Sequence, residues 1–455
     1  MIKSKRSKSF QPSHSVSRRE FLHYSALAGG VGLLPGVLST GIAAAVGRIK
    51  SPNEKLNIAV IGAGGKGASD TDGVASENIV ALCDIDETTL RKRAEKYPGA
   101  RLFRDYRKML EEMKEIDAVT VSTPDHHHAP ASMLAITLGK HVYCQKPLTH
   151  SIYEARMLTL AARKHKVATL MGNQGHSGVG VRQFCELLWA GAIGPVREAH
   201  IWTNRPIWPQ GIKRPIAVHE VPANIDWDLF LGPAPYRPFN KDAYHPFKWR
   251  GWWDFGTGAL GDMACHLMDP AFWALKLGHA ESVEAESFGG NSETAPNWAI
   301  IRYQFPARGD MPPVKIVWYD GGKKPSNELL GLAPDKKSPD NGSLFIGDKG
   351  KLTCETYGEN PRFTPDSKVQ EFPTPPPTLP RSIGHYQEWI AACKGAPNTG
   401  SNFDYAGPFT EMVLMGNLAV RAGKKIDWDG PNMRATNAPE VAQFIRREYR
   451  AGWKV

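Results

Sequence analysis

The chain has few features of the specialised protein classes, and those absences narrow what it can be. Its six cysteines are scattered and no two are spaced as CxxC, which excludes a disulfide-dense secreted scaffold and gives no zinc-binding pattern. We therefore expect buried, reduced thiols. The sequence shows no internal repeat and no amphipathic membrane helix. With 41% apolar and 22% charged residues it has a globular composition, and 455 residues predict two domains plus a further segment.

A stripe of basic residues that could follow a nucleic-acid backbone is also absent. Residues 1–45 hold six Lys or Arg side chains against Glu20 alone, so much of the formal net charge of +10 belongs to that segment. The remainder of the chain is only mildly basic, which is typical of solvated surface charge. We expect no nucleic-acid partner.

Residues 1–45 have the organisation of a targeting segment. A basic, polar stretch is followed by Ser-Arg-Arg-Glu-Phe-Leu at 17–22 and by an uncharged, weakly apolar stretch at 24–45 that ends in three alanines. Five glycines and Pro35 disfavour a membrane-spanning or core helix there, and the alanines form an A-x-A cleavage pattern. The segment resembles a twin-arginine signal peptide. That resemblance implies export of the folded protein, to the periplasm or an equivalent compartment, without a stable membrane anchor.

From residue 55 onward, short apolar runs alternate with helical patterns. The segments predicted as buried strands are 56–61, 78–83, 117–121, 141–144 and 167–171, and those predicted as helices between them are 86–97 and 151–165. Strand–helix alternation at this spacing predicts a doubly wound parallel sheet. We place this Rossmann domain at residues 55–175 and a second domain at 176–455.

The first predicted strand is followed by Gly-Ala-Gly-Gly-Lys-Gly, a GxGxxG pattern. A second match at 256–261 follows an aromatic segment instead of a strand, so only the first has the required context. The glycines that let the backbone approach a pyrophosphate at a helix N-terminus are Gly62, Gly64, Gly65 and Gly67. The next strand ends at Asp84, whose carboxylate can accept hydrogen bonds from ribose hydroxyls and would repel a 2′-phosphate. The pattern predicts NAD as cofactor, in preference to NADP.

Two places in the sequence carry side chains suited to acid–base chemistry. Lys146 follows a predicted strand and would point toward a ligand bound outside the carboxyl ends of the strands. Asp262 and His266 are four residues apart and would share one face of a helix. Taken singly, each has a structural alternative: a surface lysine at a turn, an aspartate at a helix N-terminus and a histidine within the core.

Together these places resemble the glucose–fructose oxidoreductase, inositol dehydrogenase and MocA (Gfo/Idh/MocA) superfamily, from about Leu56 to the C-terminus. The marks of the resemblance are the glycine turn, Ser-Thr-Pro-Asp at 122–125 with His128, Gln-Lys-Pro at 145–147, the Asp262/His266 pair and Gly-Asp-Lys-Gly-Lys-Leu at 347–352. The family usually has Glu-Lys-Pro where this chain has Gln145, which keeps the lysine but loses its acidic neighbour. The resemblance implies that copies associate as dimers or tetramers, and that the cofactor is contacted by Thr123, Pro124, His128 and Gln145.

The resemblance also implies a second domain with an open, mostly antiparallel sheet. The predicted fold class is therefore α/β: a Rossmann doubly wound parallel sheet plus a C-terminal α+β domain. The sequence agrees, because strand patterns occur at 282–288, 298–305, 314–319 and 343–346. A proline-rich stretch at 364–380 is expected to be a surface loop.

Other residues are candidates through their place in the chain. Those expected to line the cleft, after the last Rossmann strand or on the loop before Asp262, are Asn173, Gln174, Tyr244, His245 and Arg250. The three histidines at 126–128 predict no metal site, because consecutive side chains point different ways. The tryptophans at 202–208 and 249–253 are either sugar-stacking surfaces or packing residues, and the sequence leaves both open.

These assignments predict an NAD-dependent oxidoreductase that acts by hydride transfer on a secondary hydroxyl of a sugar, glycoside or cyclitol. His266 is the expected base because an ordinary pKa of about 6.5 suits proton exchange at neutral pH. Lys146 would stabilise the developing alkoxide, and Asp262 would orient His266 or hold a neighbouring hydroxyl. Two alternatives stay open: a redox-neutral, NAD-dependent glycosidase that oxidises, eliminates and reduces, and a non-catalytic nucleotide-binding scaffold.

Overall fold

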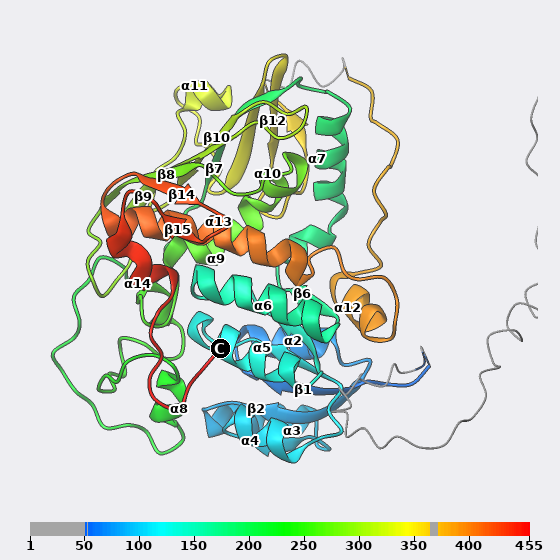
Figure 1. Cartoon of the computed structure of the whole chain (residues 1–455), viewed down its shortest axis with the longest axis vertical. Helices are drawn as coiled ribbons and strands as arrows, with labels where there is room; N and C mark the ends of the chain where they lie inside the picture. Colours follow the sequence, from blue (N-terminus) through cyan, green and yellow to red (C-terminus); the bar gives the residue numbers. More distant parts are fainter. Residues whose placement is uncertain (1–50, 52, 365–371) are drawn as a thin grey trace, which may run out of the picture. The chain divides into compact units, whose positions relative to one another are not determined.

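A computed structural model describes residues 51, 53–364 and 372–455. The targeting segment predicted at 1–45 lies outside the described residues, as does part of the proline-rich stretch; the remainder of that stretch, 372–380, contains no helix or strand. Two sheets organise the described chain, one parallel and one mixed, with helices packed between and around them (Figure 1).

The first sheet is wholly parallel and has the strand order β3-β2-β1-β4-β5-β6. Its strands are β1 (Asn57–Ile61), β2 (Asn78–Cys83), β3 (Arg101–Phe103), β4 (Ala118–Val121), β5 (His141–Cys144) and β6 (Thr169–Met171). All five predicted strands are present, and β3 is an addition. The central strands are buried along nearly their whole length, which is why they read as continuous apolar runs. The chain order reverses between β1 and β4, where such sheets bind ligands.

Helices between these strands cover the sheet. They are α2 (Lys66–Gly73), α3 (Glu87–Lys96), α4 (Tyr106–Glu112), α5 (His128–Thr137) and α6 (Ile152–His165). The two predicted helices correspond to α3 and α6. Asp86 caps α3 by accepting from the backbone N–H of Thr88, and Ser151 and Glu154 form a reciprocal capping box at the start of α6. Local sequence signals therefore place both helix starts correctly.

The second sheet has nine strands in the order β13-β12-β11-β7-β10-β9-β8-β14-β15, and only β7 and β10 pair in parallel. The strands are β7 (Val196–Trp202), β8 (Ser282–Phe288), β9 (Trp298–Phe305), β10 (Val314–Tyr319), β11 (Gly342–Gly347), β12 (Gly350–Cys354), β13 (Arg362–Phe363), β14 (Ile426–Asp429) and β15 (Arg434–Ala435). The predicted bounds of β8, β9 and β10 match the structure, and the strand predicted at 343–346 lies within β11. The predicted fold class is confirmed.

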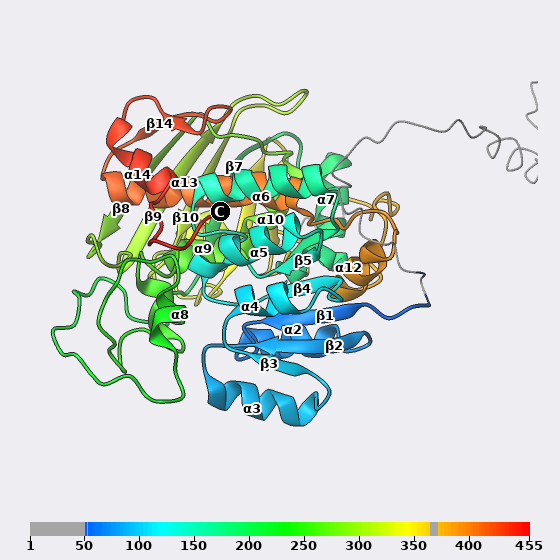
Figure 2. The ribbon, with the colours of Figure 1, turned by 60° about the horizontal axis from the view of Figure 1, so that its bottom comes forward.

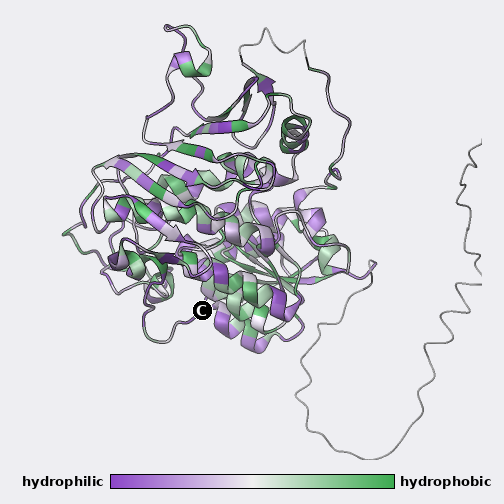
Figure 3. Ribbon diagram, turned by 45° about the horizontal axis from the view of Figure 1, so that its top comes forward, coloured by the Kyte–Doolittle hydropathy of each residue, from purple (hydrophilic) through white to green (hydrophobic). Residues whose placement is uncertain are grey.

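The second half of the described chain contains several helices, and the longest of them, α13 (Phe403–Ala422), packs against both halves. The helices of the second half are α7 (Val179–Trp189), α8 (Trp227–Leu231), α9 (Gly258–Leu267), α10 (Asp269–Ala274), α11 (Asn327–Leu330), α12 (His385–Cys393), α13 (Phe403–Ala422) and α14 (Ala442–Ile445). Helix α13 packs against α6 on one side and against β8, β9 and α9 on the other (Figures 1 and 2). Strand β9 alternates accordingly, with Ala299, Ile301 and Tyr303 buried, and Figure 3 shows the mixed hydropathy of these strands. This packing fixes α9 above the parallel sheet.

Aromatic side chains build a second, smaller core beneath the long connection between β7 and α9. Its members are Trp227, Phe230, Leu231, Ala234, Phe239, Ala243, Tyr244, Trp249, Trp252 and Phe255. The tryptophans within 202–208 and 249–253 are all buried, so packing accounts for them, although Trp249 also borders the cavity described below. All six cysteines are buried and free, as predicted. Among the described residues, no helix is both long enough and apolar enough to cross a membrane.

Candidate active site

A cavity of about 950 Å³ opens where the parallel strands end and α9 faces them. It brings together side chains that are far apart in the sequence. The predicted site residues in its lining are Gly62, Gly64, Gly65, Asp84, Thr123, Pro124, Gln145, Lys146, Gln174, His245, Arg250, Asp262 and His266. Four predicted residues, namely Gly67, His128, Asn173 and Tyr244, are not part of the lining.

The glycine turn is held in a conformation that side chains would prevent. Gly62 has a φ of +83°, and a Cβ there would lie 2.7 Å from the carbonyl oxygen of Ser122. A Cβ on Gly67 would lie 1.8 Å from the carbonyl oxygen of Gly62, so Gly67 lets α2 pack against the turn and is not part of the cavity lining. Gly65, by contrast, faces open space, and no side chain caps α2. The turn therefore presents bare backbone at a helix N-terminus, which suits a pyrophosphate.

Asp84 fastens the same turn from the neighbouring strand. Its Oδ2 accepts hydrogen bonds from the backbone N–H groups of Ala63 (2.9 Å) and Gly64 (3.1 Å), and its Oδ1 accepts one from Asp86 (3.1 Å). Burial raises the pKa of Asp84, and these three hydrogen bonds oppose that effect. The carboxylate borders the cavity, where a ribose hydroxyl could donate to it. The residues present thus fit a dinucleotide from the glycine turn to Asp84.

Lys146 and Asp262 form an ion pair at the opposite end of the cavity. The Lys146 ammonium lies 3.0 Å from Asp262 Oδ1 and donates to the Asp262 carbonyl oxygen at 2.6 Å. Arg250 approaches the same carboxylate oxygen with its Nε at 3.3 Å. Burial would raise the pKa of Asp262, but Lys146 and then Arg250 outweigh it, so the net shift is downward. The carboxylate therefore stays ionised between two cations.

His266 shares the face of α9 with Asp262, as the spacing predicts, but its surroundings change its chemistry. Burial, and next the charge of Lys146, lower the pKa of His266 to about 3, so the expectation of an ordinary pKa is wrong. Its Nδ1 has no hydrogen-bond partner among the described residues, and its ring packs edge-on against Tyr357 at 4.9 Å. Asp262 is bonded to Lys146 and Arg250, and within the described chain no hydrogen bond joins it to His266. The ring is thus a neutral proton acceptor that Asp262 does not orient.

Asp125 is a titratable group of the cavity to which sequence reasoning gave no role. It is 5% exposed, borders the cavity and accepts a hydrogen bond from Thr257 Oγ1 at 2.7 Å. Burial raises the pKa of Asp125 to about 7, against the opposing effects of Thr257 and Lys146. A carboxyl group that titrates near neutral pH can both give and take a proton. The raised pKa results from the burial of Asp125, and no local sequence pattern predicts that burial.

His128 hydrogen-bonds to the backbone of two turns that border the cavity. Its two ring nitrogens lie 2.7 Å from the Pro147 carbonyl oxygen and 2.9 Å from that of Thr123, so it links the two turns that border the cavity. Burial lowers the pKa of His128, but Cys144 and the two carbonyls outweigh it and raise the pKa overall. Because both neighbours are acceptors, the doubly protonated ring satisfies them best. His128 therefore positions Thr123 and Pro147 and does not reach the cavity.

Two predicted substrate residues face elsewhere. Tyr244 is 1% exposed and packs against Trp227 and Trp252 in the smaller aromatic core. Asn173 is fully buried and hydrogen-bonds with Asp269 and Ser401 beneath the site. Proximity in sequence to Arg250 or Gln174 did not decide where their side chains point. Both are packing or network residues.

The other two histidines of the 126–128 run also bond to backbone. The Nε2 atoms of His126 and His127 both lie near the Phe230 carbonyl oxygen, at 2.9 and 3.1 Å. In the part of the chain that the structure describes, no group of three or more His, Cys, Asp or Glu side chains could hold a metal ion.

Several residues of the lining were not predicted because they come from distant segments, and three of them illustrate this. Tyr357 lies between β12 and β13, Arg205 follows β7, and Trp453 belongs to the C-terminal segment. Trp453 also packs against Tyr106 and His127, and the guanidinium of Arg107 lies 4.2 Å from its ring centroid. No local pattern marks such residues.

A nucleotide-binding parallel sheet, a glycine turn and a lysine opposite an Asp/His helix define the class of this protein. Family models agree: residues 56–173 match the "Oxidoreductase family, NAD-binding Rossmann fold", and residues 202–455 match the "Oxidoreductase family, C-terminal alpha/beta domain" of the same family. The chain belongs to the Gfo/Idh/MocA oxidoreductase family.

Individual relatives are distant. The chain is 27% identical over 210 residues to D-glucoside 3-dehydrogenase of Escherichia coli, a match that covers 46% of this chain and 50% of that protein. It is 27% identical over 246 residues to inositol 2-dehydrogenase 1 of Saccharopolyspora erythraea, covering 51% of this chain and 67% of the relative. The match to the first of these spans only half of its length.

Solved structures show the same fold. The WlbA dehydrogenase of Bordetella pertussis, solved in complex with NADH and UDP-GlcNAcA, superposes with a TM-score of 0.59 at 16% identity, covering 83% of this chain and 99% of that one. At this identity the likeness concerns the fold.

Proposed function

We propose that the protein is an NAD-dependent dehydrogenase that oxidises a secondary hydroxyl of a small carbohydrate, either a sugar, a glycoside or a cyclitol. The observation that carries the proposal is the placement of Lys146 and His266 in one cavity with the glycine turn. Distant relatives named as sugar and inositol dehydrogenases support it. A non-catalytic scaffold would have no need of an ion-paired lysine beside a buried, neutral histidine.

The side chains divide the chemistry between them. Bound NAD would accept the hydride at its nicotinamide ring. Lys146, held by Asp262, donates a hydrogen bond to the substrate oxygen and stabilises its developing negative charge. Neutral His266 accepts a hydrogen bond from the hydroxyl and relays its proton as the hydride leaves the carbon; because its pKa is lowered to about 3 it is a weak base, so the proton must pass on to a stronger acceptor such as solvent. Arg250 keeps Asp262 ionised and thereby keeps Lys146 in place.

Asp125 favours a second candidate, the redox-neutral glycosidase. Oxidation, elimination of the leaving group and return of the hydride need an additional group that both gives and takes protons. Asp125, with its pKa raised to about 7 by burial, is suited to that task. Both candidates are tested by incubating the purified protein and added NAD with a panel of sugars, cyclitols and aryl glycosides. NADH absorbance that rises with substrate supports the dehydrogenase, whether it stops at about one equivalent per chain because the cofactor is retained or continues in proportion to added NAD; aglycone release without net NADH supports the glycosidase; neither signal from any substrate contradicts both.

Export and assembly complete the proposal. The twin-arginine pattern at 17–22 supports export to the periplasm, and Arg18→Lys with Arg19→Lys should leave the precursor in the cytoplasm. Normal export of that double variant would contradict the targeting proposal. Association of copies as dimers or tetramers is proposed from family resemblance, and light scattering of the mature protein measures it directly.

A further inference from the structure

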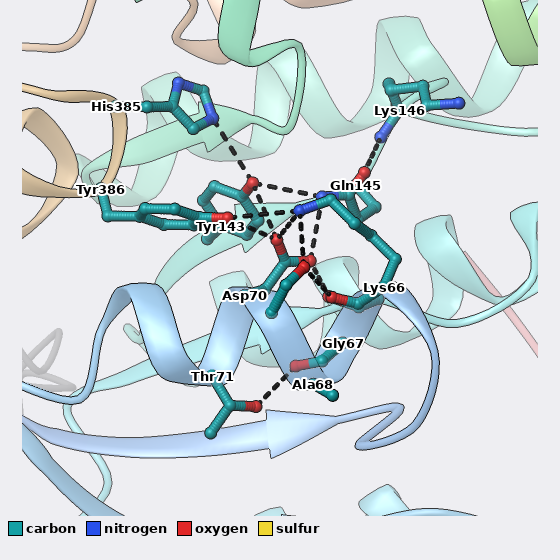
Figure 4. A network of polar contacts seen from close by, with 12 residues as sticks. Lys66, Gly67, Ala68, Asp70, Thr71, Tyr143, Gln145, Lys146, His385 and Tyr386 are labelled. Carbon is teal, nitrogen blue, oxygen red and sulfur yellow. Dashed lines mark hydrogen bonds and ion pairs between the residues drawn. The ribbon is translucent and has the colours of Figure 1, made fainter.

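The carboxylate of Asp70, on α2, is the centre of a buried polar network behind the cavity (Figure 4). Its Oδ1 lies 2.5 Å from the Lys66 ammonium and accepts from the Tyr386 hydroxyl at 2.8 Å. Its Oδ2 accepts from Ser122 Oγ at 2.7 Å and from Gln145 Nε2 at 2.9 Å. These donors come from four separate segments. Asp70 therefore connects helix α2, the turn after β4, the turn after β5 and helix α12 through hydrogen bonds.

Asp70 itself is not part of the cavity lining, whereas Lys66, Ser122 and Gln145 are. A fully buried carboxylate is tolerated only when a positive charge and several hydrogen bonds compensate it, and Lys66 supplies that charge. Removal of the carboxylate would leave Lys66 without its anionic partner and would take one acceptor from each of four neutral donors: Ser122, Tyr143, Gln145 and Tyr386. Any effect of Asp70 on the site must therefore act through these cavity residues.

Gln145 transmits the position of Asp70 to the lysine turn. Because Asp70 can only accept, the amide nitrogen of Gln145 must face it, and Gln145 Oε1 then accepts from the backbone N–H of Lys146 at 3.3 Å. Tyr143 confines the same amide from one side, at 3.2 Å. Gly172 confines it from the other, since a Cβ there would lie 2.6 Å from Gln145 Nε2. The side chain has one orientation, and that orientation is fixed by charge at position 70.

We propose that Asp70 is a positioning residue for Lys146, and that positions 70 and 145 share one negative charge. In this chain the negative charge is on the carboxylate at position 70, in α2, and the neutral amide is at position 145. A glutamate at 145 would place two buried carboxylates within hydrogen-bonding distance of each other, which is strongly unfavourable. The Glu-Lys-Pro pattern usual in the resembling family would thus be incompatible with Asp70. The role rests on the proposed function, because it concerns how Lys146 is held.

The same carboxylate also connects the two halves of the cavity. Lys66 begins α2 next to the glycine turn, and the Ser122 backbone crowds Gly62. Loss of the Asp70 charge should therefore weaken dinucleotide binding as well as lysine placement. A residue that only supported Lys146 would change the rate and leave affinity for NAD alone.

The test is a charge exchange in three variants: Asp70→Asn, Gln145→Glu and the double variant. Each single variant should bind NAD more weakly and turn over about 10- to 100-fold more slowly, since small misplacements of reacting groups cost that much. The double variant should recover to within about threefold of wild type, because one carboxylate and one amide again face each other. A double variant no better than the worse single variant would overturn the proposal.

The Gln145→Glu variant has a second signature that needs no substrate. Two adjacent carboxylates share a proton, so the pKa of the pair in the folded state rises above its unfolded value. The folded apo-protein is then favoured at acid pH and loses stability as pH rises through that raised pKa. Asp125 and Asp320 give every variant a background loss of stability over this range, because burial raises the pKa of each to about 7. Urea unfolding of the apo-protein from acid to neutral pH should show a further loss in Gln145→Glu and only the background loss in the double variant. Identical pH profiles would contradict the shared charge, even if no substrate for the enzyme is found.

Glu77→Gln is the matched control. Glu77 is also a buried, ion-paired carboxylate of the first sheet, bonded to Lys394 and to the backbone N–H of Leu56, but it does not border the cavity. Its loss should lower the unfolding free energy without changing NAD affinity or turnover. If Glu77→Gln slows turnover as much as Asp70→Asn, the effect of Asp70 is general destabilisation and the positioning role is wrong.

Discussion

The Lys146 ammonium donates to both the carboxylate and the carbonyl oxygen of Asp262, at 3.0 and 2.6 Å. This double contact joins the end of strand β5 to the middle of helix α9. It fixes the ammonium by two acceptors on one residue, so its position depends on α9 as much as on its own strand. Arg250 reinforces the arrangement by donating from Nε to the same carboxylate oxygen.

Replacement of Lys146 by methionine should abolish most activity while the fold survives. Methionine keeps the length and apolar stem of lysine but cannot donate to a developing alkoxide, so kcat should fall about 10²- to 10³-fold. NAD affinity, measured by calorimetry, should change little. Lys140→Met is the control, because Lys140 bonds the Lys114 carbonyl outside the cavity. Near-normal turnover by Lys146→Met would show that the lysine has no catalytic role.

Replacement of His266 by glutamine tests the proton acceptor. Glutamine can hold a hydroxyl by a hydrogen bond but cannot take its proton, so kcat should fall about 10²- to 10⁴-fold with a smaller change in KM. The wild-type ring stays neutral across the neutral range because burial and Lys146 lower its pKa to about 3. His141→Gln, another partly buried histidine outside the cavity, should keep full activity. A loss confined to KM would reassign His266 to substrate binding.

Asp125→Asn should change the pH dependence of both stability and catalysis. Burial raises the folded-state pKa of Asp125 from 3.8 to about 7, so its contribution to stability is present below pH 4 and lost as pH rises toward 7. The variant should lack that slope in unfolding experiments. Asp320→Asn is a close control, since burial raises the pKa of Asp320 to about 7 as well, in the second sheet. Only Asp125→Asn should abolish the change in turnover rate that the wild type shows near pH 7. If the pH dependence of the rate is unchanged in this variant, Asp125 has no part in the chemistry.

Asp84→Ala should reduce the preference for NAD over NADP. In the wild type the carboxylate repels a 2′-phosphate and can accept from a ribose hydroxyl, so the NADP dissociation constant should exceed that of NAD by about tenfold or more. The variant should bind NAD more weakly than the wild type does, because the backbone N–H groups of Ala63 and Gly64 lose their acceptor. Its affinity for NADP should be about equal to its affinity for NAD. Calorimetric titration with both nucleotides measures the ratio. A wild-type protein that prefers NADP would contradict the role of Asp84.

The sequence predicted the fold well wherever one periodicity dominates. Strand β9 alternates buried and more exposed residues along its length, and its bounds could be read directly. The bounds of β8 and β10 were also predicted correctly, although β8 buries only Val283 and β10 is buried continuously over 316–318. Strand β3 has three residues, and β13 and β15 have two each, which is too short for any period to appear. Their existence depends on a neighbouring strand that offers hydrogen bonds.

The candidate site shows the same contrast between what the sequence motifs predict and what depends on distant parts of the chain. Lys146, Asp262 and His266 could be proposed because their motifs together resemble the Gfo/Idh/MocA family, whereas each alone had a structural alternative, and the structure brings them to one cavity. The pKa of His266 could not be predicted, since it depends on burial and on a lysine 120 positions away in the chain. Tyr244 shows the converse: its neighbour His245 borders the cavity, while Tyr244 itself points into an aromatic core. Adjacent loop residues need not share an environment.

We expect the C-terminal segment to help retain the cofactor. Trp453 borders the cavity beside Tyr106, with Arg107 stacked on its ring, and so connects the end of the chain to the first sheet. The proposed export would place the enzyme where free NAD is expected to be scarce, so it would gain from a cofactor that is bound during folding and released slowly. The bound NADH must then be reoxidised in place, by a second substrate or by return of the hydride to the same molecule. A wall residue contributed by a distant segment slows release, because the segment must move before the ligand leaves.

We predict that the mature protein, purified without added nucleotide, carries about one NAD per chain, and that Trp453→Ala loses most of it. Truncation of a half-buried aromatic side chain in the cavity wall should raise the NAD dissociation constant about tenfold, which corresponds to about 1.4 kcal/mol. Chromatography of the nucleotide released on denaturation measures occupancy, and stopped-flow fluorescence measures the release rate. Trp428→Ala, which removes a buried tryptophan of β14 away from the cavity, should lower stability without changing occupancy. Wild-type protein that emerges as apo-enzyme and needs millimolar NAD for turnover would show that the cofactor exchanges in each cycle, and the role of Trp453 in retention would then be wrong.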